Sequence, residues 1–205
     1  MRRGDIVILM RSAVNYADIF YQTLRDNGID CYLENNGGYF EHIEVMTFMD
    51  LLRIIDNMRQ DLPLLSVLRS PIFSFSIDDL IEIRRSEKGV PYHEAFLSYP
   101  ENGRDAMLKK RVSEVVSSIM RWKKQQGYVP LDDFVWKLMG ETGFYMYAGA
   151  MPGGEQRQAA LRMLTEKAAY FRQRGSVTLY GFIRYIDNMR MRKIDMAQPN
   201  ITSDR

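Results

Sequence analysis

The chain has 205 residues, of which 46% are hydrophobic and 26% charged, so it is long enough to bury a core and typical of a soluble globular protein. No apolar run approaches the roughly 20 residues of a membrane span, and the apolar run after the first residues is too short for a signal peptide, so we expect a cytoplasmic protein. The single cysteine, Cys31, excludes an internal disulfide and a cysteine-rich zinc site. The formal net charge of +2 is too small to indicate nucleic-acid binding by itself.

The first 40 residues predict a β-α-β unit. Residues 6–10 form a continuous apolar run typical of a buried parallel strand, and residues 29–33 predict a second strand. Between them, Asn15 can cap a helix that Asn27-Gly28 would end in the left-handed conformation. No third strand follows, and a two-stranded parallel sheet with two apolar faces is not expected to be stable in water. We therefore favour a piece of a larger protein over strands that pair with another copy.

Helical spacing of apolar residues dominates from residue 41 onward. The expected helices cover residues 41–57, 62–68, a segment from the cap Ser76 to the stop at 89–91, and then 92–98, 104–126, 130–138, 145–148, 155–172 and 179–191. Turns are expected at 100–103 and 151–154 because proline and glycine interrupt helices there. The sequence therefore predicts a mainly α fold with a small β-α-β appendage.

The longest expected helix, 104–126, has an amphipathic pattern. Its expected buried stripe consists of Met107, Val112, Val115, Ile119 and Trp122. Basic residues cluster on the same helix and again in 184–193, while acidic residues concentrate in 78–82 and 132–133. Such runs are more often solvated helix faces than binding sites.

The sequence contains no pattern that predicts catalysis or a metal site. A Gly-x-x-x-x-Gly-Lys-Ser/Thr motif is absent, so we expect no ATP site in this chain. His42 and His93 are far apart, and neither has a further ligand at zinc spacing. Cys31 lies in a predicted strand, and no Gly-x-Ser-x-Gly elbow is present. We expect no catalytic residue and no cofactor in this segment.

Two patterns have a second interpretation. Gly153-Gly154 before a helix can form a phosphate nest, but a sharp turn is favoured because Glu155 already occupies the positive end of the helix. Phe144, Tyr145 and Tyr147 can stack on bases, although a place in the core is favoured.

Three motifs carry a resemblance to a known family. They are Gly37-Gly38-Tyr39-Phe40-Glu41 before a helix with Glu44, Val45, Phe48, Leu52 and Ile55; Leu68-Arg69-Ser70-Pro71; and Gly143-Phe144-Tyr145 running to Pro152-Gly153-Gly154-Glu155-Gln156-Arg157-Gln158-Ala159. Together they resemble the A subunit of the bacterial AddAB-type ATP-dependent helicase/nucleases, which are UvrD/Rep-like superfamily one helicases. The resemblance covers nearly the whole chain but only an internal part of those longer proteins.

The resemblance implies three regions. Residues 1–40 would be part of the second RecA-like motor domain (2A), 41–197 the inserted helical 2B subdomain, and 198–205 a loose tail. The junction with the motor domain would include Arg11, Gly37, Gly38, Phe40 and Glu41. The nuclease domain and the ATP-site motifs would lie outside this chain, with ATP and Mg expected for the parent protein only.

The same resemblance implies a non-catalytic, DNA-facing or regulatory subdomain of an enzyme that processes double-strand breaks for recombinational repair. Its implied partners are DNA, as a duplex or a single-strand/duplex junction, the second subunit of the complex and the remaining motor domains. The candidate DNA contacts are Arg69, Ser74 and Ser76 at a hairpin-like turn, with Lys109, Lys110 and Lys124 as diffuse phosphate contacts. Relatives carry Gly-Ile-Gly at this turn, whereas this chain has Phe73-Ser74-Phe75-Ser76, whose rings are expected to hinder close approach of a phosphate.

The alternative is a helical protein-interaction module whose apolar β-α-β surface docks a partner without touching DNA. A third possibility, a small-ligand-binding helical domain, has no sequence feature in its favour. Salt dependence separates the first two, because phosphate contacts weaken steeply with salt and apolar docking hardly changes.

Overall fold

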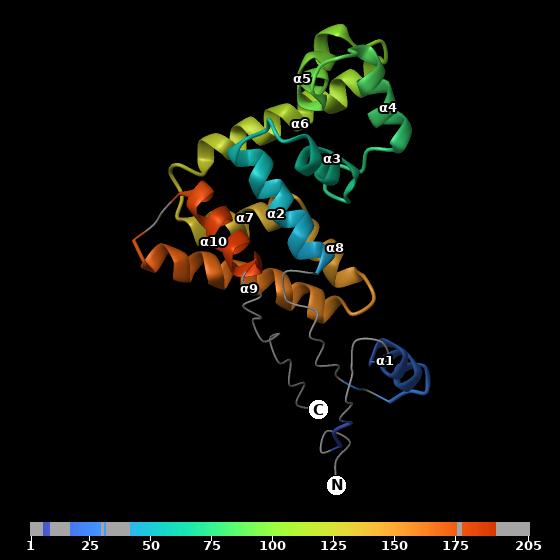
Figure 1. Cartoon of the computed structure of the whole chain (residues 1–205), viewed down its shortest axis with the longest axis vertical. Helices are drawn as coiled ribbons and strands as arrows, with labels where there is room; N and C mark the ends of the chain where they lie inside the picture. The colour runs from blue at the N-terminus through green and yellow to red at the C-terminus, as the bar shows by residue number, and fades with distance from the viewer. Residues whose placement is uncertain (1–5, 9–16, 30, 32–41, 176–177, 192–205) are drawn as a thin grey trace.

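A computed structural model describes residues 6–8, 17–29, 31, 42–175 and 178–191 (Figure 1). The helices in these ranges are α1 (Ala17–Asp26), α2 (Ile43–Asp56), α3 (Asp61–Arg69), α4 (Ile77–Ser86), α5 (Tyr92–Asn102), α6 (Ala106–Gln125), α7 (Leu131–Glu141), α8 (Phe144–Ala150), α9 (Gly154–Gln173) and α10 (Leu179–Met191). The described residues include no strand, which confirms the mainly α fold class. None of these helices is long and apolar enough to span a membrane.

The predicted β-α-β unit is confirmed only for its helix. α1 ends at Asp26 and is followed by Gly28, whose φ of 70° is left-handed; the backbone N–H of Ile29 donates to the carbonyl of Leu24 at 2.9 Å. Residues 6–8, Ile29 and Cys31 are not in strands, because no neighbouring strand among the described residues supplies a ladder of backbone hydrogen bonds. The other positions of both predicted strands lie outside the described residues. So do the junction residues Arg11, Gly37, Gly38, Phe40 and Glu41, and the tail 198–205.

Helices α2 to α10 pack into one body around α2. α2 contacts α3, α6, α9 and α10, and its buried residues are Glu44, Val45, Phe48, Met49, Leu51, Leu52, Ile54 and Ile55. They cover most of its circumference, which is the pattern of a central helix rather than of a surface helix. In Figure 1, α4 and α5 lie at one end of the body and α9 and α10 at the other, with α2 and α3 side by side between them.

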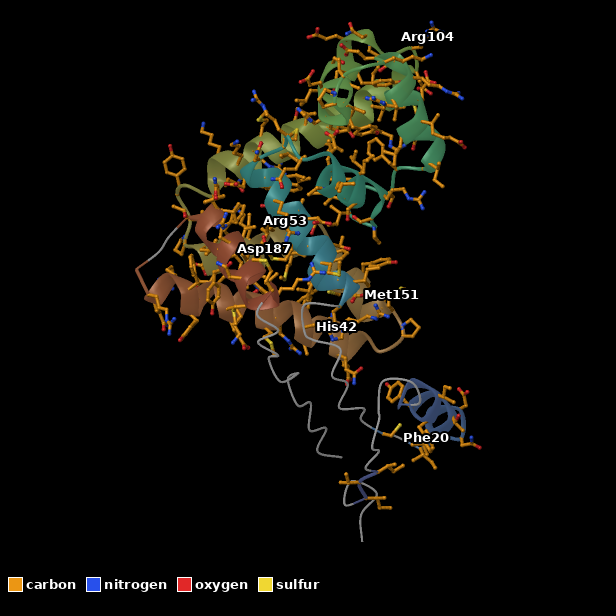
Figure 2. All side chains as sticks on the ribbon, in the orientation of Figure 1. Phe20, His42, Arg53, Arg104, Met151 and Asp187 are labelled. Carbon is orange, nitrogen blue, oxygen red and sulfur yellow. The ribbon has the colours of Figure 1, made fainter. Side chains whose placement is uncertain are left out.

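Arg53 of α2 pairs with two aspartates, one of which lies in α10. Arg53 donates to Asp50 at 2.7 Å on its own helix and to Asp187 of α10 at 2.5 Å. Figure 2 shows Arg53 and Asp187 facing each other across the middle of the body. Since the two aspartates satisfy one guanidinium, this contact fixes the position of α10 along α2.

Two sequence predictions inside the body were wrong. Residues 100–102 are the last turn of α5 rather than a separate turn, because Pro100 lies near the helix end and removes only one hydrogen bond there. Met107 is 76% exposed, and Leu108 takes its place in the buried stripe. Asp105 caps α6 by accepting from the N–H groups of Met107 and Leu108, and the spacing from Leu108 to Val112 continues the stripe.

The corner between α8 and α9 explains one of the motifs. Gly153 has a φ of 71°, and a Cβ on Gly154 would collide with the carbonyl oxygen of Gly149. The favoured interpretation of this segment as a sharp turn is therefore confirmed, because the backbone at Gly154 packs directly against the backbone at Gly149. Arg157, one turn into α9, donates to the carbonyl of Pro152 at 3.0 Å and pairs with the buried Glu44 of α2. The motif thus joins the α8–α9 corner to the start of α2.

Candidate nucleic-acid interface

The α3–α4 turn, residues 70–76, has one tightly bonded conformation. The carbonyl of Ser70 accepts from the N–H groups of Phe73 at 3.2 Å and Ser74 at 2.8 Å, and the N–H of Phe75 donates to the carbonyl of Leu68 at 2.8 Å. Ser74 has a φ of 54°, which is uncommon for a residue with a side chain. The turn is therefore a defined loop between two helices, as the candidate DNA contact requires.

The two rings of the turn anchor it to the body. Phe75 is buried, with its ring centroid 6.5 Å from that of Phe96 in α5. Phe73 is half-buried and stacks on Trp122 of α6 at 6.3 Å. Ser74, between them, is exposed. Because the rings pack inward, they hinder approach to the exposed side of the turn less than their bulk suggests.

Arg111 of α6 ties this turn to α4. Its guanidinium donates to the carboxylate of Asp79 at 2.9 Å and to the carbonyl of Ser74 at 3.3 Å, and it lies 4.3 Å from the centroid of the Phe75 ring. Burial alone would raise the pKa of Asp79, but hydrogen bonds from Ser76 and Arg111 outweigh it and hold the pKa below its ordinary value. Arg111 therefore fixes the shape of the turn.

Ser76 forms a reciprocal cap with Asp79. Its hydroxyl accepts from the N–H of Asp79 at 3.0 Å, and its own N–H donates to the Asp79 carboxylate at 2.9 Å. The hydroxyl proton of Ser76 is still available to donate. The hydroxyl of Ser74 donates to the carbonyl of Pro71 at 3.3 Å, a long bond that is easily exchanged. Both serines thus keep donors for a phosphate, next to carboxylates that already occupy the start of α4.

The lysines of α6 do not all share one surface. Lys110 and Lys124 are exposed and 14 residues apart, which places them within about 40° of each other around the helix and roughly 21 Å apart along it. Arg121 lies between them and comes within 3.6 Å of Glu141. Lys109 points elsewhere and donates to the carbonyl of Glu101 at 3.0 Å. We call Lys110, Arg121 and Lys124 the basic face of α6, although the exposed Glu114 lies on the same side of the helix.

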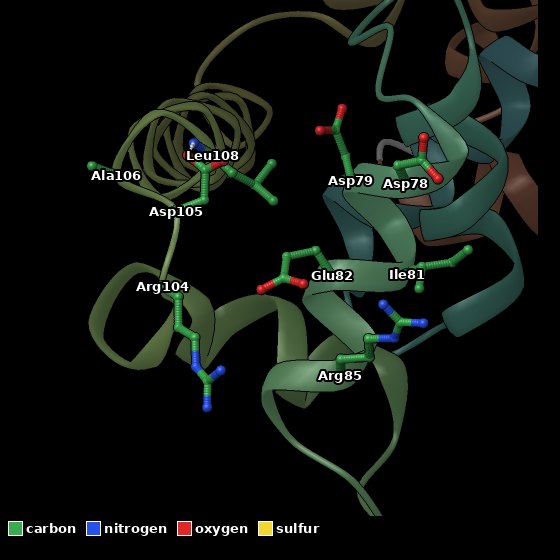
Figure 3. A pocket seen from close by; sticks show the side chains of 9 residues that line it. All are labelled: Asp78, Asp79, Ile81, Glu82, Arg85, Arg104, Asp105, Ala106 and Leu108. Atoms are coloured by element: carbon green, nitrogen blue, oxygen red, sulfur yellow. Dashed lines mark hydrogen bonds between the residues drawn. The ribbon is translucent and has the colours of Figure 1, made fainter.

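A hollow with an excess of carboxylates lies next to the turn. It has a volume of about 700 Å³ between α4 and the start of α6 and is lined by four carboxylates, those of Asp78, Asp79, Glu82 and Asp105, with Arg85 and Arg104 at its border (Figure 3). No set of three metal-ligating side chains occurs in the described part of the chain. The excess of carboxylates over arginines makes this hollow unfavourable for a phosphate.

The sequence prediction named the turn and the lysines but missed Arg111, which holds the turn through Asp79 and Ser74. The signal was present, because Arg111 precedes Val115 by four residues and so lies on the packed side of α6 rather than with Lys110. Arg69, the last residue of α3, is exposed just before the turn.

Comparison with curated proteins identifies the relatives of this chain, although no protein-family profile matches it. Over 98% of its length it is 43% identical to the A subunit of the ATP-dependent helicase/nuclease of Alkaliphilus metalliredigens and to that of Alkaliphilus oremlandii. It is 42% identical to the protein of the same name from Syntrophomonas wolfei. The chain is a homologue of one segment of the ATP-dependent helicase/nuclease A subunit. It spans 17% of the length of each of these helicase/nuclease proteins, in agreement with the resemblance seen in the motifs.

Proposed function

We propose that this chain is a non-catalytic, DNA-facing and regulatory subdomain of an ATP-dependent DNA helicase/nuclease that processes double-strand breaks for recombinational repair. The observation that carries the proposal is the basic face of α6 beside a turn that Arg111 holds in one conformation. The two lysines project from one side of the helix, so both can contact phosphates of the same duplex.

In this proposal the six candidate residues have different parts. Lys110 and Lys124 contact phosphates from the basic face, and Arg69 does so beside the turn. Ser74 and Ser76 donate hydroxyl hydrogen bonds to a phosphate, while Arg111, which is paired with Asp79, only holds the turn in shape. Lys109 contributes only long-range attraction, because its ammonium group is turned toward Glu101.

The rest of the parent protein supplies the chemistry in this account. The sequence has no phosphate-cradle motif, so we assign ATP and Mg to the motor domains, and DNA cleavage to a nuclease domain. The second subunit of the complex is a further expected partner. The names of the relatives do not favour the alternative of a protein-interaction module that makes no DNA contact.

Fluorescence anisotropy with a labelled duplex that carries a single-stranded tail tests the proposal. The variant Lys110→Gln/Lys124→Gln is expected to bind more weakly and to lower the slope of log affinity against log salt by about 1.8, the value for two lost phosphate contacts. The matched control is Lys88→Gln/Arg162→Gln, which removes two exposed cations that form no ion pair with any described residue. An equal loss in both variants would reduce the interaction to general charge attraction and contradict the proposal.

A further inference from the structure

A second surface combines tyrosines and arginines at the α9–α10 end of the body. At the end of α9 the guanidinium of Arg174, the residue after the helix, lies 4.6 Å from the centroid of the Tyr170 ring. In α10 the guanidinium of Arg184 lies 6.0 Å from the Tyr180 ring and 3.5 Å from its hydroxyl. The two tyrosines are 44% and 56% exposed. Each pair is spaced four residues apart, so the partners lie on the same side of their helix.

The two pairs belong to one continuous surface. Phe171 of α9 packs against Tyr185 of α10, with centroids 5.2 Å apart, and against Phe182 at 5.8 Å. Tyr185 is half-buried beside Tyr170 and Arg174. Around α10, Arg184 and Gly181 lie between the exposed Tyr180 and Tyr185. We call Tyr170, Arg174, Tyr180, Arg184 and Tyr185 the tyrosine–arginine face.

The arginines of this face keep their charge available. Neither Arg174 nor Arg184 forms an ion pair within the described ranges. Their neighbour Arg172, by contrast, is held by Asp132 at 2.7 Å, and that carboxylate accepts from two of its nitrogens. The face therefore presents two cations that are stacked on rings but not neutralised.

This combination selects one kind of ligand. An apolar protein partner would have to desolvate two uncompensated guanidinium groups, which is costly. A single-stranded nucleic acid offers phosphates for the cations and flat bases for the tyrosine and guanidinium planes. A duplex offers the phosphates but keeps its base faces stacked inside, so it satisfies only half of the surface.

We propose that the tyrosine–arginine face binds single-stranded DNA by stacking bases on Tyr170 and Tyr180 while Arg174 and Arg184 contact the phosphates. The inference does not depend on duplex binding at the basic face of α6, since it concerns other helices. It extends the nucleic-acid role to the unpaired strand.

Binding of a fluorescent thymidine oligonucleotide to the full chain tests this inference. Tyr170→Leu/Tyr180→Leu is expected to weaken binding by about tenfold or more, because stacking on each ring is lost. The matched control is Tyr128→Leu, which removes a tyrosine that is 83% exposed in the α6–α7 connection. Circular dichroism of all variants checks that the fold is kept, as expected for exposed side chains.

An oligonucleotide of the same length with abasic sites separates stacking from charge. It is expected to bind the original chain as weakly as the thymidine oligonucleotide binds the double variant. Equal binding of both oligonucleotides by the original chain, an equal loss in Tyr128→Leu, or no binding of thymidine at low salt would each overturn the inference. Lys110→Gln/Lys124→Gln is expected to lose duplex binding and to keep most of the single-strand binding, so failure of one proposal is distinguishable from failure of the other.

Discussion

The α3–α4 turn and the tyrosine–arginine face both place an arginine on an aromatic ring, but with opposite consequences. At the turn, Arg111 stacks on the buried Phe75 and is neutralised by Asp79, so the interaction stabilises the fold. On the other face, Arg174 and Arg184 stack on exposed tyrosines and form no ion pair with a described carboxylate. Burial of the ring and the presence of a counter-charge therefore decide whether a cation–ring pair stabilises the fold or remains available to a ligand.

The largest difference in unfolding free energy between the two regions is expected when their aromatic rings are removed. Phe75→Ala removes a buried ring and is expected to lower the free energy of unfolding by about 3 kcal/mol, whereas Tyr170→Ala is expected to cost less than about 1 kcal/mol. Urea unfolding followed by circular dichroism measures both. Similar losses in the two variants would show that Tyr170 is part of the core and would remove the distinction.

The arginines are expected to differ by a smaller amount. Arg111→Ala leaves Asp79 without its cationic partner and should lower the free energy of unfolding by about 1.5 kcal/mol, after allowance for partial exposure. Arg174→Ala should change it by less than about 0.5 kcal/mol, because this exposed arginine stacks on an exposed ring and forms no ion pair with a described residue. An Arg111→Ala variant as stable as the original chain would contradict the role of Arg111 in holding the turn.

Ser74 tests whether the shape of the turn is fixed. A β-branched side chain is strained at a φ of 54°, so Ser74→Val should cost about 1 kcal/mol more than Ser74→Gly, which adopts this conformation freely. Thermal unfolding of the two variants gives the difference. If valine is tolerated as well as glycine, the left-handed conformation at Ser74 is not a constraint.

Acid should remove part of the stabilisation at the turn. The pKa of Asp79 is lowered in the folded chain, so its contribution is fully present above the unfolded pKa of about 3.9 and is lost as the pH falls through the lower folded value. The difference in stability between the original chain and Arg111→Ala should therefore shrink below about pH 4. A difference that stays constant down to the acid limit would mean that the Asp79 carboxylate is not the partner that matters.

Much of the helical body could be predicted from the sequence because its helices have strong local signals. α10 has the expected bounds of 179 to 191, and the cap at Ser76 is present as expected. Where the signal is one of spacing alone, single positions shift, as Met107 and Leu108 show. The domain limits at 40, 197 and 198 remain predictions, because the residues around them lie outside the described ranges.

The candidate surfaces were harder to predict because they depend on contacts between distant segments. The four-residue spacing of Tyr170 with Arg174 and of Tyr180 with Arg184 is visible in the sequence. Their union into one face depends on Phe171 meeting Tyr185 across two helices, which no local pattern indicates. The clamp of Arg111 on Asp79 likewise joins residues 32 positions apart.

The central claim, a DNA-facing subdomain, is tested most directly by the salt dependence of duplex binding to the unaltered chain. Anisotropy of a labelled duplex with a single-stranded tail should show affinity that falls linearly with log salt, with a slope of about 2 or more, because several phosphates are neutralised. No binding at low salt, or an affinity that does not change with salt, would contradict the claim and leave a role in docking other parts of the helicase/nuclease.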